Sequence, residues 1–163
     1  MTPAPALAAT TWTIKPGGAI TATSSGRFTL KDARTGTMLP CYSATASGTL
    51  KHGSGLPGSR VGSLSAVGFT NCLAPGISNS DVRLTLRATD LPWHVNLSSY
   101  NAATGVVHGT VSHIQITQTG PPGCTAVIDG TSGTASDGQV RFTYTDSTGQ
   151  LTLLTTEIGR AHV

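Results

Sequence analysis

The residues best suited to ligand recognition in this chain are Trp93, His94 and Tyr100, which lie close together in the sequence. An exposed aromatic ring beside polar groups can stack on a sugar ring or contact a wall polymer or a lipid headgroup. A Trp that follows a Pro in a β protein more often fills the core or seals the end of a barrel. Core packing is therefore the first interpretation of Trp93, and a binding site at the three residues is the candidate kept beside it.

Histidines that could ligate a metal ion have an unfavourable spacing. His108 and His113 are five residues apart, which places them on opposite faces of a regular strand. Only a local irregularity in that strand would bring them to one side. Solvent-facing or hydrogen-bonded histidines are the preferred interpretation of the whole set, which comprises His94, His108 and His113 beside Asp90. We therefore predict no metal site and no cofactor.

Motifs for hydrolysis are weak. No Gly-x-Ser-x-Gly occurs, so the strand-to-helix turn that exposes a nucleophilic serine has no counterpart here. A glycosidase needs two carboxylates, one with a raised pKa, whereas Asp32, Asp137 and Asp146 lie in turns where capping explains them. We predict that the protein is not an enzyme, with a hydrolase of unrecognised site as the less favoured alternative.

Three cysteines, Cys41, Cys72 and Cys124, leave one thiol over in a chain that otherwise looks exported. Three pairings are open in principle, and no spacing favours zinc or a redox dithiol. We prefer Cys41 with Cys72, because the loop is compact and each lies at the end of a predicted strand. Closing that loop stabilises the folded state by about 3–4 kcal/mol in the loop-entropy model. Cys124 is then expected to pair with a cysteine outside this sequence, and the alternative is a cytoplasmic protein with buried free thiols.

The elements that must position these residues are predicted to be strands. Charged residues make up 10% of the 163 residues, far below the usual share of about 25%, while 27 Thr and 16 Ser favour extended structure. Gly- and Pro-rich turn signals recur at short intervals, and residues 81–89 alternate between apolar and polar side chains. We predict an all-β fold, an antiparallel β-sandwich or closed β-barrel of about ten strands.

The longest predicted strand, residues 106–119, changes the parity of its apolar positions. Val111 lies on an odd position, but Ile114 and Ile116 lie on even ones. A bulge near Ser112 would explain the change, as would a strand that passes from one sheet to another.

Charge and hydropathy exclude some partners. The net charge is +3 and the Lys and Arg residues are scattered singly, so nucleic acid is a poor partner. No apolar run approaches the length of about 18 residues that a transmembrane helix needs.

The two ends differ from the rest of the chain. Residues 1–10 include Ala6-Leu7-Ala8, which has the form of a signal-peptidase site, and they are predicted to be a remnant of that region or a disordered leader. Residues 157–163 match the in-frame translation of a widely used sequencing adapter, and we expect them to be an artefact. Residues 11–156 are predicted to form one domain, incomplete at its C-terminal end.

Several segments resemble a family of secreted proteins from Actinobacteria. The likeness is carried by residues 11–18, 91–97, 100–101, 104–107, 109–110 and 123–131, which include Thr-Trp-Thr-Ile, Leu-Pro-Trp-His, Tyr-Asn and Gly-Cys-Thr-Ala. The resemblance implies a signal peptide, export, a disulfide-bonded β fold and a further Cys-containing C-terminal segment. It assigns no catalytic or binding residue.

Taken together, these features predict a secreted, non-catalytic β protein with an extracellular or envelope-associated structural or binding role. Its partner would be a cell-wall polymer or lipid. The alternative is a β-barrel that binds a small apolar ligand, for which small residues or voids should replace interlocked side chains on the inward face.

Overall fold

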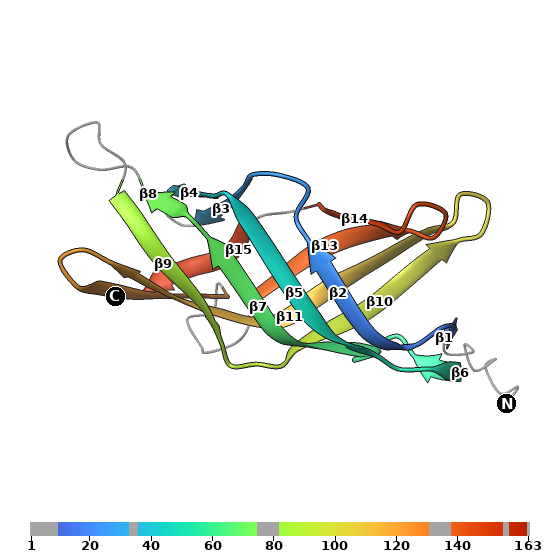
Figure 1. Cartoon of the computed structure of the whole chain (residues 1–163). Coiled ribbons are helices and arrows are strands. Elements are labelled where there is room, and N and C mark those ends of the chain that lie inside the picture. Colours follow the sequence, from blue (N-terminus) through green and yellow to red (C-terminus); the bar gives the residue numbers. More distant parts are fainter. Residues whose placement is uncertain (1–9, 33–35, 75–81, 131–137, 155–156, 163) are drawn as a thin grey trace, which may run out of the picture.

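A computed structural model describes residues 10–32, 36–74, 82–130, 138–154 and 157–162 of the chain (Figure 1). These residues form strands joined by turns, and no helix long and apolar enough to cross a membrane occurs among them. The predicted leader comprises residues 1–10, of which residues 1–9 lie outside the described part.

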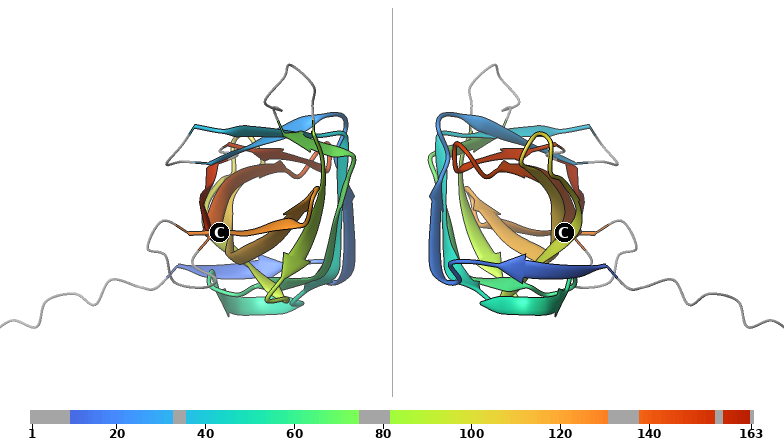
Figure 2. Two further views of the ribbon diagram at one scale, coloured as in Figure 1. Left: turned by 90° about the vertical axis from the view of Figure 1, so that its left-hand side faces the viewer. Right: turned by 90° about the vertical axis from the view of Figure 1, so that its right-hand side faces the viewer.

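The main sheet is antiparallel and contains ten strands, which confirms the predicted fold class. Its strands are β2 (Gly18–Thr23), β5 (Ser43–Leu50), β7 (Gly62–Thr70), β9 (Val82–Thr89), β10 (Trp93–Asn101), β11 (Val106–Gly120), β12 (Cys124–Asp129), β13 (Gly138–Thr145), β14 (Gln150–Leu153) and β15 (Glu157–His162). The sheet curls strongly around the core, as the end-on views of Figure 2 show. The described strand pairings do not close into a ring.

Five shorter strands complete the fold. They are β1 (Thr11–Ile14), which pairs with β6 (Gly53–Pro57), β3 (Phe28–Asp32), which pairs with β4 (Met38–Cys41), and β8 (Cys72–Ala74), which pairs with β9. β15 pairs with β12 and, in parallel, with β3. Residues 157–162 are therefore placed in a strand, while their origin in a sequencing adapter stays a prediction.

Strand β11 is the centre of the sheet and is flanked by two strands on each side. Its first half lies between β10 and β13, and its second half lies between β9 and β12. The ladder shifts register between Ser112 and Ile114, and His113 there has a left-handed backbone with φ 66°. This irregularity confirms the predicted bulge. It turns Ile114 and Ile116 to the same buried face as Val111.

The core lies on the inner face of these strands. One row across the sheet joins Val95, Val111 and Val140, all of them buried. In the next row Gly109 lies opposite Phe142. A Cβ at Gly109 would collide with the Asn96 carbonyl oxygen and the Phe142 ring, so the close approach of these strands requires glycine.

The disulfide forms as the sequence predicts, between Cys41 and Cys72. The S–S distance is 2.02 Å, and both residues are only 1% exposed. Because Cys41 ends β4 and Cys72 begins β8, the bond ties the β3–β4 hairpin to the strand beside β9. Cys124 is an exposed free cysteine, and its pairing with a cysteine outside this sequence stays a prediction.

Candidate functional site

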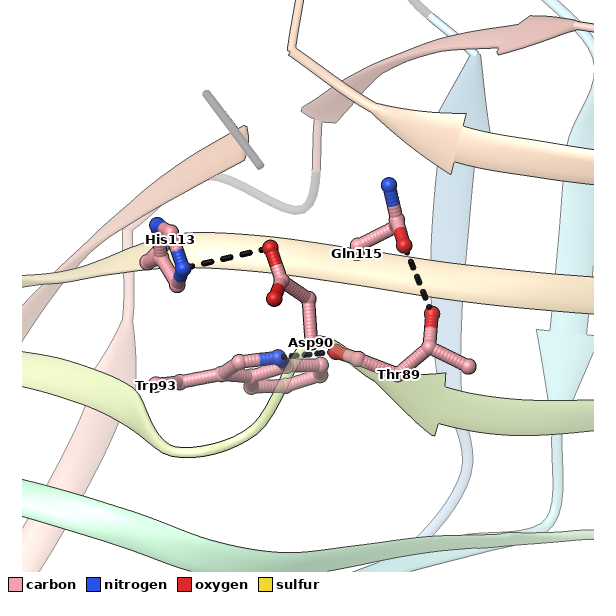
Figure 3. Close-up of polar contacts among 5 residues, drawn as sticks. All are labelled: Thr89, Asp90, Trp93, His113 and Gln115. Carbon is pink, nitrogen blue, oxygen red and sulfur yellow. Dashed lines mark hydrogen bonds and ion pairs between the residues drawn. The ribbon is translucent and has the colours of Figure 1, made fainter. Parts of the chain in front are cut away.

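The structure does not bring the three predicted binding residues together. Trp93 is buried, 5% exposed, and its indole Nε1 donates a hydrogen bond to the Thr89 carbonyl oxygen at 3.0 Å (Figure 3). This burial agrees with core packing, the first interpretation of Trp93, and contradicts the stacking role kept beside it. Tyr100 is half exposed, beyond a register shift between Leu97 and Ser99 near the end of β10, so it belongs to another part of the surface.

His94 instead belongs to a cluster at an interruption between two strands. β9 and β10 follow one another along the same flank of β11, separated by residues 90–92. Asp90 has a left-handed backbone, φ 54°, and faces the bulge at His113. Its Oδ2 lies 3.2 Å from His113 Nε2, with both side chains partly exposed. Two backbone irregularities thus meet in one acid–imidazole pair (Figure 3).

A hydrogen bond beside this pair fixes the two strands. The Thr89 hydroxyl donates to the Gln115 side-chain oxygen at 3.1 Å, and the two residues are also partners in the β9–β11 ladder. Together with the Trp93 indole bond, it holds the last residue of β9 from both its backbone and its side chain.

The His94 ring packs beside the His113 ring, with centroids 5.1 Å apart and an interplanar angle of 37°. The pKa of His94 is lowered from 6.5, first by burial and then by the positive charges of Arg60 and His113. These causes all disfavour the imidazolium. The lowered pKa favours the neutral imidazole of His94, and an anion placed beside the ring would oppose this effect.

Asn96 positions Arg60 next to His94. The Asn96 side-chain oxygen accepts a hydrogen bond from the Arg60 backbone N at 2.9 Å, while its Nδ2 donates to the Ser112 hydroxyl at 2.9 Å. Arg60 itself has φ 50°. The loop before β7 is thereby anchored to the outward faces of β10 and β11.

Next to this anchor lies a hollow of about 310 Å³, which we call the basic hollow. Three of its side chains are basic, two carry hydroxyls, and none is acidic. The Thr49 and Ser63 hydroxyl oxygens are 3.4 Å apart, and Ser63 faces His94 in the β7–β10 ladder. The lining residues are Thr49, Leu50, Lys51, Arg60, Gly62, Ser63 and His94. The side chains of the basic hollow can therefore donate hydrogen bonds and supply positive charge.

A second hollow, the threonine–alanine hollow, crosses β2, β5 and β7 and measures about 460 Å³. Its lining holds small polar and apolar side chains and no ionisable group; it consists of Thr21, Ala22, Thr23, Thr45, Ala46, Ser47, Ala66, Val67 and Gly68.

The histidines do not assemble a metal centre in the described part of the chain. The bulge brings His113 beside His94, while His108 lies farther along β11, opposite Ser99. No group of three or more His, Cys, Asp or Glu side chains there is arranged to hold a metal ion.

Sequence reasoning missed Lys51 and Arg60. They flank segment 53–58, whose Gly and Pro content is typical of turns. The local sequence therefore predicts a turn and not a site. Only the β5–β7 and β7–β10 pairings, which join distant parts of the chain, place both beside His94.

Comparison of the chain with protein-family models, curated proteins and solved structures finds no match.

Proposed function

We propose that this chain is a secreted, non-catalytic β protein with a binding or structural role outside the cell or at its envelope. The observation that carries the proposal is the Cys41–Cys72 disulfide, almost completely buried between two short strands. Disulfides persist in oxidising compartments and are rare in the cytosol. The resemblance of residues 91–97 and 123–131 to secreted proteins of Actinobacteria supports export as well.

The polar outward face favours binding over catalysis. His94, Asn96 and Ser112 occupy neighbouring outward positions on β10 and β11. Their hydrogen bonds and ring contacts hold one another and Arg60. Such a surface suits recognition of a hydroxylated or charged partner, for example a wall polymer or a lipid headgroup.

Export is tested by trapping thiols in the source organism. Cells and medium are alkylated without reductant, and the cysteines of this chain are then mapped by mass spectrometry. We expect the protein in the medium or envelope fraction, with Cys41 and Cys72 protected from alkylation. A cytosolic protein with all three cysteines alkylated would contradict the proposal.

A second candidate function is binding of a small apolar ligand, and the threonine–alanine hollow favours it. Small side chains such as Ala22 and Ala46 line that hollow, as a ligand site requires. Titration with a hydrophobic dye should then show one saturable site, which Ala46→Leu removes. A signal that rises without saturation would exclude this candidate.

Absence of catalysis is tested separately. A panel of esterase, protease and glycosidase substrates should give no turnover above that of the buffer. Turnover that copurifies with the folded protein and is lost in His94→Gln would show a hydrolase instead.

A further inference from the structure

The basic hollow carries an inference beyond a general binding role. Lys51 and Arg60 line it with His94, and the positive charge of Arg60 is close enough to His94 to disfavour its protonation. Like charges that oppose one another in the free protein are relieved when an anion lies between them. The hollow therefore has the electrostatic character of a site for a negatively charged ligand.

The donors in the hollow favour a particular shape of anion. The Arg60 guanidinium offers a planar fork of N–H donors that fits phosphate and similar oxyanions, and Lys51 offers a compact charge. The hydroxyls of Thr49 and Ser63 can donate to further oxygens. A tetrahedral oxyanion has enough acceptor atoms to accept hydrogen bonds from several of these donors at once.

We propose that the basic hollow binds a tetrahedral oxyanion, a phosphate or sulfate group, through Lys51, Arg60, Ser63 and His94. A volume of about 310 Å³ exceeds that of the bare ion and leaves room for part of a sugar or polyol that carries the group. This assignment names the ligand class of the proposed extracellular binding function and rests on it.

The pH dependence of oxyanion binding depends on the charged groups around His94. His113 packs against it from β11 and is paired with Asp90, and Arg60 and Lys51 line the hollow. The neighbouring strand β7 contributes Ser63 and no ionisable side chain. Because His94 gains charge as the pH falls, oxyanion affinity should rise between about pH 8 and about pH 5.

The test is calorimetric titration of the oxidised full chain with sodium sulfate, which keeps both charges over this pH range, whereas a phosphate ester loses one near pH 6. Arg60→Gln should weaken sulfate binding about tenfold or more. It leaves the hydrogen bond from the residue 60 backbone to Asn96 in place. Lys51→Gln provides a second variant should Arg60→Gln not fold, which circular dichroism will show.

The matched control is Arg83→Gln, which removes the same charge from an exposed position on β9 outside the hollow. It should change affinity less than about twofold, because exposed distant charges are screened. The assignment would be overturned if sulfate does not bind. It would also be overturned if Arg60→Gln and Arg83→Gln lose sulfate affinity equally.

A parallel titration with dextran sulfate and uncharged dextran distinguishes a polymer-borne group from a free ion. Tighter binding of dextran sulfate, lost in Arg60→Gln, indicates a polymer; equal affinity per sulfate group indicates a free ion. Dextran sulfate binding that Arg60→Gln leaves unchanged counts against the hollow. A failed titration of a protein that thiol trapping shows to be exported would reject the oxyanion site and leave the proposed function standing.

Discussion

The two faces of the β10–β11 pair differ completely in chemistry although they alternate residue by residue. Inward, Trp93, Val95 and Val111 are buried. Outward, His94 and Ser112 are partners in the ladder and carry polar groups that bond or stack with their neighbours. Side chains that stabilise the fold and side chains available for recognition are therefore adjacent residues of the same strand. Substitutions on the inner face should destabilise the protein, and those on the outer face should alter binding.

The largest expected effect comes from Trp93→Ala. The change removes a buried indole and its hydrogen bond to Thr89, and should lower the free energy of unfolding by about 3–5 kcal/mol. Urea denaturation followed by circular dichroism measures it. Tyr100→Ala, at a half-exposed position, should cost less than about 1 kcal/mol. Equal losses of unfolding free energy in the two variants would contradict the burial of Trp93 in the core.

A smaller loss is expected for Gly109→Ala on the inner face. The added methyl group would meet the Asn96 carbonyl oxygen and the Phe142 ring, and overpacking of this kind costs about 1–3 kcal/mol. Gly26→Ala is the control, because its Cβ would meet nothing within 4 Å. Thermal unfolding should separate the two variants, and an unchanged midpoint for Gly109→Ala would contradict the close packing described.

His94 should add a weak pH dependence to stability. Its folded pKa is lowered, so the folded state binds fewer protons than the unfolded state as the pH falls through and below about 6.5. Its contribution to stability is therefore complete above that pH and is lost as the pH falls toward the folded pKa. Denaturation midpoints measured across this window should fall less in His94→Gln than in the parent protein. Parallel curves would show that His94 is not perturbed.

The smallest effect on stability is expected for Arg60→Gln. Its side chain is exposed, and the backbone hydrogen bond to Asn96 does not involve the guanidinium. The free energy of unfolding should change by less than about 0.5 kcal/mol, although sulfate binding should weaken about tenfold or more. A large loss of stability measured by urea denaturation would show that the Arg60 side chain stabilises the fold and does not serve recognition alone.

Much of the fold can be predicted from the local pattern of apolar and polar residues in the sequence. Alternation in residues 81–89 predicts the buried Leu84 and Leu86, and the parity change before Ile114 predicts the bulge. Such signals are readable because strand side chains alternate with a period of two.

The candidate site is not local in this sense. His94 meets Ser63 through strand pairing, and Lys51 and Arg60 join it only through the packing of β5, β7 and β10. The inward direction of Trp93 likewise depends on which face of β10 is covered. Neither the register between distant strands nor the covered face can be read from the composition of residues 91–100.

The most direct test of the separation between the faces is an NMR titration of the His94 ring with and without sulfate. We expect sulfate to raise the pKa of His94, because an anion in the basic hollow favours the imidazolium, and we expect Arg60→Gln to reduce this rise greatly. Trp93 resonances should hardly move. A His94 pKa that sulfate leaves unchanged, or one that rises equally in Arg60→Gln, would contradict a recognition site on the outer face.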